Sequence, residues 1–140
     1  PLTFRSGGTS LSGQGVTDQL LVDTRAGFRG IEVLDGGERV RVQPGATVRQ
    51  VNARLARHGR RLGPDPASEI ACTIGGVIAN NSSGMACGIE QNTYRTLESM
   101  TLVLASGATI DSASTDSDGR DADEQLRAAA PELWAGLSAL

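Results

Sequence analysis

A glycine- and serine-rich stretch near the start of the chain constrains the fold more than any other feature. Residues 5–15 read RSGGTSLSGQG and follow the short apolar run PLTF. A turn between strands rarely needs so many small residues, whereas a backbone that wraps an anion does, because successive N–H groups in a glycine-rich turn converge on one negative charge. The stretch therefore predicts either an anion-binding loop or a flexible linker between strands.

This stretch partly matches two known phosphate-binding motifs, but it completes neither of them. Gly8 and Gly13 have the spacing of a P-loop, but Gln14 and Gly15 stand in place of its lysine and its hydroxyl residue. A dinucleotide fingerprint could begin at Gly13, but Asp18 replaces its third glycine. The stretch therefore favours neither nucleoside triphosphate chemistry nor a Rossmann site.

A second loop of small residues, CTIGGVIANNSSG at 72–84, shifts the balance towards anion binding. Its paired glycines open a predicted short helix, where free N–H groups favour an anion. The alternative is a tight packing site where only glycine fits. The chain contains no lysine and no basic cluster. We therefore predict that the backbone of the two loops, rather than side-chain charge, holds a diphosphate.

Composition excludes several other classes of function. The chain has 140 residues and a net charge of −3, with no run of arginines to bind nucleic acid. It has no apolar stretch as long as a membrane span. Cys72 and Cys87 are too few and too far apart for a disulfide framework or a metal site, so we expect them to be reduced. We expect a cytoplasmic protein, or one that lies peripherally at the inner membrane.

Short apolar runs and turn residues predict an α+β fold, with a mostly antiparallel sheet and flanking helices. The expected strands lie at 3–5 and 19–24, in a hairpin over 30–45, and on either side of a Ser-Gly turn in 97–111. The expected helices begin at the capping box of Thr47 and Gln50, at about Gly75, and at 123, with a break at Pro131. A mobile polar loop is expected at 114–124.

Three motifs in this order and spacing, PLTFRSGGTSLSGQG, GPDPAS and CTIGGVIANNSSG, resemble the FAD-binding domain of the FAD-linked oxidases. These are vanillyl-alcohol-oxidase-like flavoproteins that include glycolate oxidase and D-lactate dehydrogenase subunits. The resemblance covers nearly all of 1–112, and residues 80–111 look most like bacterial proteins that join such a half to an iron–sulfur half. It implies that 1–140 is a single partial domain, the larger FAD-binding subdomain, which lacks an upstream subdomain and a downstream substrate cap.

The resemblance also implies which residues hold FAD. Thr9 stands where some relatives carry a histidine that attaches the flavin, so we expect non-covalent FAD. Arg5 would brace the first loop or add charge. The remaining implied cofactor-binding residues are Ser6, Gly7, Gly8, Thr9, Ser10, Gln14, Gly15, Pro64, Asp65, Ser68, Thr73, Ile74, Gly75, Gly76, Asn80, Ser83 and Gly84. No catalytic residue and no metal ligand is expected in this segment, since Asp65 and Glu69 are better explained as solvated turn residues than as a general base.

The resemblance implies a flavin-dependent dehydrogenase that oxidises a small D-2-hydroxy acid such as D-lactate or glycolate. Hydride would pass to FAD, and electrons would leave through an iron–sulfur domain of the full-length protein or through a quinone. Two alternatives remain open. One is an enzyme similar to the flavoprotein reductase of UDP-N-acetylenolpyruvylglucosamine. The other is a non-catalytic module that binds a small anion.

Overall fold

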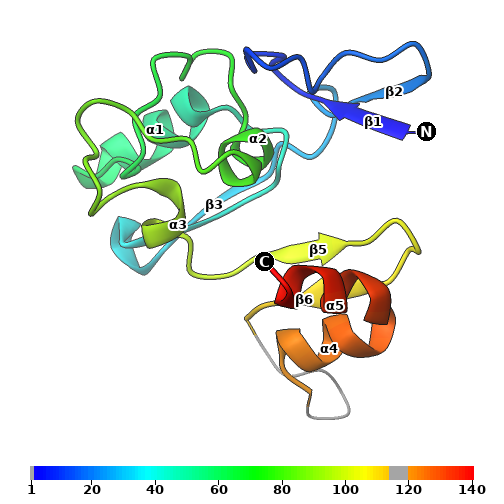
Figure 1. Cartoon of the computed structure of the whole chain (residues 1–140). Coiled ribbons are helices and arrows are strands. Elements are labelled where there is room, and N and C mark those ends of the chain that lie inside the picture. Colours follow the sequence, from blue (N-terminus) through cyan, green and yellow to red (C-terminus); the bar gives the residue numbers. More distant parts are fainter. Residues whose placement is uncertain (1, 114–119) are drawn as a thin grey trace. The chain divides into compact units, whose positions relative to one another are not determined.

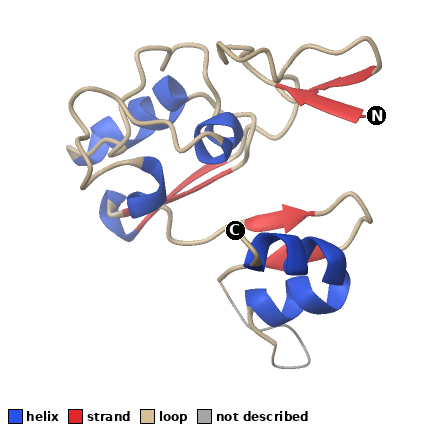
Figure 2. Cartoon of the chain, viewed as in Figure 1, coloured by secondary structure: helices blue, strands red, loops and turns tan. Residues whose placement is uncertain are grey.

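The computed structural model describes residues 2–113 and 120–140, which divide into two compact units, Pro1–Thr96 and Leu97–Leu140 (Figure 1). The boundary between the two units falls near residue 96. That residues 1–140 form a single partial domain stays a prediction. Each unit combines short strands with helices (Figure 2). The expected α+β class is confirmed.

The first unit begins with a parallel pair of strands, β1 (Leu2–Arg5) and β2 (Leu20–Asp23). They align from Leu2 opposite Leu20 to Arg5 opposite Asp23. The two strands lie within one residue of their predicted positions. Parallel pairing needs a long connection, and the glycine-rich segment 6–19 supplies it. In the described residues the strands form separate two-stranded sheets, of which this one is parallel, rather than the one mostly antiparallel sheet expected.

The predicted hairpin is confirmed as β3 (Ile31–Leu34) and β4 (Arg39–Val42), which pair antiparallel. The 3₁₀ turn η1 (Asp35–Gly37) joins them, and Gly36 and Gly37 have φ of 65° and 97°. A residue with a Cβ adopts such angles only with strain, so the glycines allow the tight turn.

The helix expected from Thr47 is confirmed as α1 (Val48–Leu55), which the turn η2 (Ala56–His58) extends. Both halves of the predicted capping box form between Thr47 and Gln50. The apolar face of α1 is fully or almost fully buried and packs against the hairpin, mostly through aliphatic side chains. The buried core residues of the first unit are Ala46, Val48, Val51, Leu55, Cys72, Val77 and Cys87.

We expect replacement of Thr47 by alanine to lower the free energy of unfolding by about 1 kcal/mol. The Thr47 hydroxyl accepts a hydrogen bond from Gln50 N at 3.2 Å, and alanine leaves that amide without its acceptor. Urea unfolding measures the effect. Thr47→Ser keeps the hydroxyl and is the control. A loss as large in serine as in alanine would contradict the capping explanation.

Two short helices follow in the first unit, α2 (Ile74–Ala79) and α3 (Thr93–Thr96). The first begins one residue before its expected start, and the second was not predicted. Asn92 caps α3, since its Oδ1 accepts a hydrogen bond from Arg95 N at 3.0 Å. The sequence signal for α3 was this capping asparagine, which a four-residue helix makes easy to overlook.

The second unit contains the antiparallel pair β5 (Thr101–Val103) and β6 (Thr109–Asp111), followed by α4 (Ala122–Ala129) and α5 (Pro131–Ser138). The strand–turn–strand unit and the helix break at Pro131 are as predicted. Gln125 of α4 is buried and its Oε1 accepts a hydrogen bond from Asp111 N at 3.1 Å, which ties the helix to the strand. Much of the loop expected at 114–124 lies outside the described residues.

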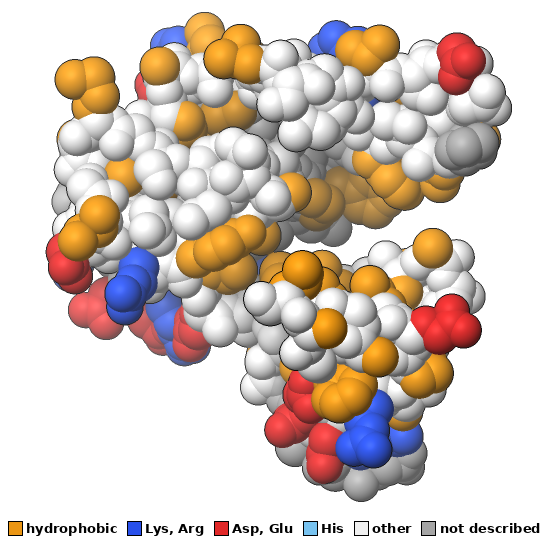
Figure 3. All heavy atoms as spheres, viewed as in Figure 1, with side chains coloured by type: hydrophobic (Ala, Val, Ile, Leu, Met, Phe, Trp, Pro, Cys, Tyr) orange, Lys and Arg blue, Asp and Glu red, His pale blue; other side chains and the backbone are white. Residues whose placement is uncertain are grey.

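Exposed apolar side chains occur on both units, and many are visible in Figure 3. None of the helices within 2–113 and 120–140 combines the length and the apolar character that a transmembrane span requires.

Candidate functional site

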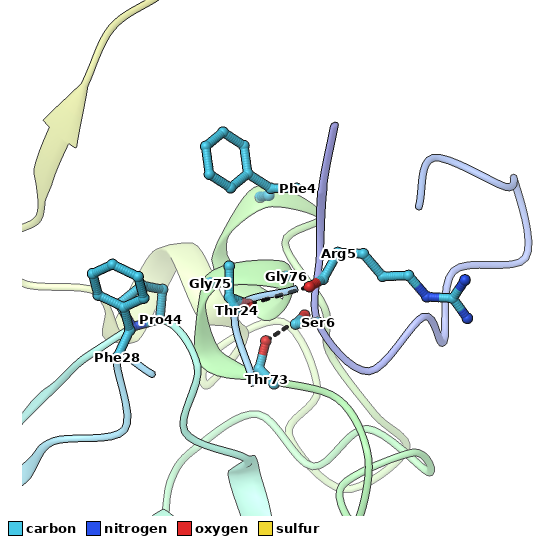
Figure 4. A pocket seen from close by; sticks show the side chains of 10 residues that line it. Phe4, Arg5, Ser6, Thr24, Phe28, Pro44, Thr73, Gly75 and Gly76 are labelled. Carbon is cyan, nitrogen blue, oxygen red and sulfur yellow. Dashed lines mark hydrogen bonds between the residues drawn. The ribbon is translucent and has the colours of Figure 1, made fainter. Parts of the chain in front are cut away.

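The two loops of small residues lie against each other in the first unit. Thr73, at the start of α2, is almost fully buried, and its Oγ1 donates a hydrogen bond to Ser6 Oγ at 2.6 Å. Figure 4 shows this bond beside Gly75 and Gly76. The hydroxyl pair therefore joins the end of β1 to the start of α2, across a sequence separation of 67 residues.

Gly7 brings the first loop into close contact with the main chain that precedes Thr73. A Cβ on Gly7 would lie 2.1 Å from the carbonyl oxygen of Ala71. No side chain fits at that distance, so glycine is needed at this position. This packing and the Ser6–Thr73 hydrogen bond together fix the beginning of the first loop.

The next feature of the first loop is a run of main-chain amides that have no acceptor in the described part of the chain. No acceptor among residues 2–113 and 120–140 takes a hydrogen bond from the main-chain N–H groups of residues 7–10. The loop is held by other contacts, such as the hydrogen bond that Ser10 Oγ donates to Gln14 Oε1. The loop is thus fixed at its base, and several of its amides have no acceptor within the described residues. Such a loop suits an anion such as a diphosphate, because its N–H groups can converge on the negative charge.

The side chain of Arg5 packs against this loop and supports it. Its carbonyl oxygen accepts a hydrogen bond from Thr24 N at 2.9 Å. Its guanidinium lies against Gly8, where a Cβ would be 2.7 Å from Nη2, and its stem lies near Gly15. Gly8 also has φ of 64°, which favours glycine. Of the two roles considered for Arg5, bracing has direct geometric support.

The start of α2 differs from the expectation. The amide of Ile74 donates to Ala46 O at 2.9 Å, and the amide of Gly75 donates to Pro44 O at 3.0 Å. The prediction of free N–H groups is therefore wrong at these two positions, because the chain before α1 already satisfies them. Gly75 is a packing glycine, since a Cβ there would lie 2.7 Å from Pro44 Cβ.

Gly76, in contrast, faces open space. A Cβ on Gly76 would have only Ser6 Oγ nearby, at 3.8 Å. Gly76 lines a cavity of about 400 Å³ together with Arg5, Ser6, Thr73 and Gly75. The structure thus brings five of the predicted residues to one cavity from both loops. The other predicted residues do not line it.

Sequence reasoning missed the rest of the cavity wall. The missed lining residues are Phe4, Thr24, Phe28, Pro44 and Ala79. The available signal was the scarcity of phenylalanine, which occurs only twice in the chain. Both phenylalanines are exposed and both border this cavity (Figure 4).

The segment 63–65 holds the loop after α2 rather than lining the cavity. Asp65 accepts hydrogen bonds from Ala86 N at 3.1 Å and from Cys87 N at 3.0 Å. A Cβ on Gly84 would lie 2.2 Å from Asp65 Oδ1, and one on Gly63 would lie 2.7 Å from Gln91 O. The side chain of Asp65 is therefore engaged in bracing and is not the solvated turn residue that was expected.

Three other members of the predicted set, Ser68, Asn80 and Ser83, have local hydrogen-bond partners. Ser68 O accepts from the amides of Ala71 and Cys72, while Pro64 is buried. Asn80 Nδ2 donates to Ser82 Oγ at 3.2 Å. Ser83 Oγ donates to Asn81 O at 3.3 Å.

Two residues that were not singled out tie the same loop to α3. Asn81, with φ of 46°, accepts a hydrogen bond from Tyr94 N at 3.0 Å through Oδ1. Thr93 Oγ1 donates to Ser82 O. Both links join residues too far apart for a sequence motif to reveal.

We expect Asp65→Ala to loosen residues 84–88 and to lower stability by about 1–3 kcal/mol, because two amides lose their acceptor. Hydrogen exchange of a peptide covering 84–91 should become faster. Asp65→Asn retains an acceptor oxygen and should have a smaller effect. Glu69→Ala removes an exposed carboxylate nearby and is the control. Equal exchange in all these variants would show that Asp65 does not hold the loop.

Two titratable groups of the first unit have shifted pKa values, and each shift has a clear physical cause. Hydrogen bonds from Arg25 lower the pKa of Asp23, at the end of β2, to about 2. Burial raises the pKa of the Cys72 thiol, so it stays protonated at neutral pH. Cys72 and Cys87 are both free.

Comparison with known protein families gives one match that covers most of the chain. The family described as FAD binding domain matches residues 1–113. No solved structure matches the chain.

Three curated relatives are similar to this chain. The glycolate oxidase subunit GlcD of Escherichia coli is 37% identical over 130 residues, covering 86% of this chain and 25% of that protein. The D-lactate dehydrogenase of Archaeoglobus fulgidus is 36% identical, covering 79% and 25%. The D-2-hydroxyglutarate dehydrogenase of Pseudomonas putida is 35% identical, covering 74% and 10%. The chain thus spans a quarter or less of the length of these relatives.

Proposed function

The chain belongs to the family of FAD-binding domains, and from this premise we propose that it binds FAD non-covalently as part of a longer flavin-dependent dehydrogenase. Residues 6–10 and Gly76 would hold the diphosphate. The observation that carries the proposal is the Ser6–Thr73 hydrogen bond, because it unites two distant loops of small residues at one cavity.

The residues present fit a diphosphate. The main-chain amides of residues 7–10 have no acceptor among the described residues and can donate hydrogen bonds to a ligand. Gly76 leaves open the space that a Cβ would fill. A hydrogen bond to a charged group contributes about 1.5–3 kcal/mol, so a few such donors outweigh a net charge of −3 spread over the protein. The Arg5 guanidinium behind the loop adds a positive charge near the same place.

Bound FAD would supply the redox chemistry by accepting a hydride from the substrate. The chain's own contribution is to bind and orient. Ser6 and Thr73 set the distance between the two loops, and Gly7 and Gly8 allow the loop its path. Asp65 keeps the following loop in place. We assign no acid–base role to any residue of this chain.

We propose a D-2-hydroxy acid as the substrate, because the three relatives are named for glycolate, D-lactate and D-2-hydroxyglutarate. Residues outside this chain would complete the site, since the relatives are more than three times as long. In this proposal the chain is the larger FAD-binding subdomain of a vanillyl-alcohol-oxidase-like fold. Electrons would leave through an iron–sulfur domain of the full-length protein or a quinone.

Anaerobic titration of the full-length protein tests the substrate. D-Lactate, glycolate or D-2-hydroxyglutarate should bleach the flavin absorbance, and L-lactate should not. Bleaching by none of the hydroxy acids in a protein that contains FAD would reject the substrate while leaving FAD binding intact. A full-length protein that binds no FAD would reject the whole proposal.

Acid precipitation of the full-length protein should release all of its flavin into the supernatant. Threonine at position 9 offers no ring nitrogen for a flavin–histidine bond. Chromatography of the supernatant identifies the flavin as FAD, and the absorbance of the washed pellet measures what stays behind. Flavin that remains with the pellet would contradict the non-covalent assignment.

A further inference from the structure

A basic surface at the end of α1 corrects the expectation that the chain has no basic cluster. Residues 54–61 read RLARHGRR, so they hold four of the thirteen basic residues of the chain. All four arginines are exposed. No acidic residue occurs between Glu38 and Asp65. The arginine face consists of Arg54, Arg57, Arg60 and Arg61.

The local fold holds the backbone of the arginine face in place. Gly59, with φ of 66°, ends the turn η2 in the left-handed conformation. The amide of Arg60 donates a hydrogen bond to Leu55 O at 3.2 Å. The amide of Leu62 donates to Asn52 Oδ1 at 2.9 Å. Because these bonds tie the end of the segment back to α1, the arginines project from a fixed backbone.

Most of the arginine face has no acidic partner within the described part of the chain. Arg60 lies 3.7 Å from a carboxylate oxygen of Glu38. Arg54, Arg57 and Arg61 form no ion pair with any carboxylate of residues 2–113 and 120–140. Like charges three or four residues apart repel one another, so this arrangement costs some stability.

The helix dipole explains only part of this arrangement. A positive charge near the carbonyl end of a helix is favourable, and Arg57 and His58 lie in the last turn. The dipole amounts to about half an elementary charge at that end, however, so it does not account for four arginines. A binding role accounts for the whole face.

We propose that the arginine face is a docking surface for an acidic protein, which contacts it through aspartate and glutamate side chains. A guanidinium donates two parallel hydrogen bonds to one carboxylate, a geometry that lysine does not offer. The first unit carries eleven arginines against eight acidic residues, so its field attracts such a partner although the whole chain is negative. No residue of the arginine face lines the cofactor cavity, so the two surfaces are separate.

Other anionic surfaces fit the arginine face less well. Within residues 39–69, all of which the structure describes, no large aliphatic or aromatic side chain is exposed. The arginines therefore have no apolar neighbour that could enter a membrane, and stable attachment to lipid needs a second signal besides charge. Residues 54–61 also contain no aromatic side chain on which a nucleic acid base could stack. An acidic protein requires neither feature.

Binding of fluorescent poly-L-glutamate to the full-length protein, followed by anisotropy, tests the proposal. We expect binding that weakens as salt is added, because exposed charges more than about 8 Å apart are largely screened at physiological ionic strength. Combined replacement of Arg54, Arg57 and Arg61 by glutamine should weaken the binding by about tenfold. This variant should melt no lower than the parent, because the replacement relieves repulsion.

The matched control replaces three exposed arginines elsewhere in the first unit by glutamine, so it removes the same charge. These are Arg29, Arg41 and Arg95. The control should bind poly-L-glutamate nearly as the parent does. Equal weakening in the control would show that net charge alone, rather than the arginine face, governs the binding, and would overturn the proposal.

Vesicles of phosphatidylglycerol and a DNA duplex represent the other classes of partner. Tighter binding of either one than of poly-L-glutamate, lost in the arginine-face variant, would overturn the proposal in favour of lipid or nucleic acid. A parent protein that does not bind poly-L-glutamate, or a variant that binds it as tightly as the parent, would also overturn it. The FAD content of the parent is measured separately, so each of these results leaves the proposed function standing.

Discussion

The full-length protein with Gly76→Val should purify without FAD while its melting temperature stays close to that of the parent. The Cβ of residue 76 enters the cavity, where the nearest atom is Ser6 Oγ at 3.8 Å, so the protein itself does not oppose the substitution. Valine and glycine differ little in helix propensity, and stability should hardly change. The isopropyl group would occupy the space assigned to the diphosphate.

The expected loss of affinity for FAD is at least about a hundredfold, because displacing the diphosphate removes several hydrogen bonds of about 1.5–3 kcal/mol each. The flavin content of the purified protein and titration of the apoprotein measure it. Gly136→Val in α5 is the control, since a Cβ there also meets open space. Normal flavin content in the Gly76 variant would show that this face of α2 does not contact the cofactor.

Gly7→Ala should lose FAD for a different reason and should also lower stability. Its Cβ would lie 2.1 Å from the carbonyl oxygen of Ala71, a main-chain atom that cannot move away alone. Overpacking of this kind costs about 1–3 kcal/mol, and it would push the first loop away from Thr73. We therefore expect a lower midpoint of urea unfolding together with at least a tenfold weaker affinity for FAD.

Gly15→Ala is the control for the first loop, because its Cβ would be an ordinary 3.4 Å from Arg5 Cγ. It should bind FAD nearly as the parent does. If Gly7→Ala keeps both its stability and its flavin, the loop does not approach Ala71 as closely as described. If Gly15→Ala loses flavin equally, the loop needs glycine throughout and the specific contact at Gly7 explains nothing.

The elements predicted correctly are those that local signals determine. The capping box at Thr47, the turn glycines of the β3–β4 hairpin and Pro131 each act within a few residues of the structure they define. These signals depend on backbone geometry and nearby hydrogen bonds, which a sequence displays directly. The helix α3 was not predicted, because a single turn of helix shows almost no periodic pattern in the sequence.

The parts that sequence reasoning missed depend on contacts between distant segments. The amides of Ile74 and Gly75 donate hydrogen bonds to carbonyl oxygens within residues 44–46. No sequence motif at α2 indicates these acceptors. Asp65 finds its partners at Ala86 and Cys87. Phe4 and Phe28 meet at one cavity only after β1 and β2 have paired. Identifying such partners requires the fold.

The glycine-rich segment is also the connection between two adjacent, paired strands, so folding brings its ends together before any ligand arrives. The entropy of closing this loop grows slowly with its length, by about 0.6 kcal/mol for each doubling. The half of the connection after Gln14 can therefore gain or lose residues at little thermodynamic cost, while residues 6–10 stay anchored at Ser6 and Gly7. Length variation among natural homologues should accordingly concentrate between Gly15 and the start of β2.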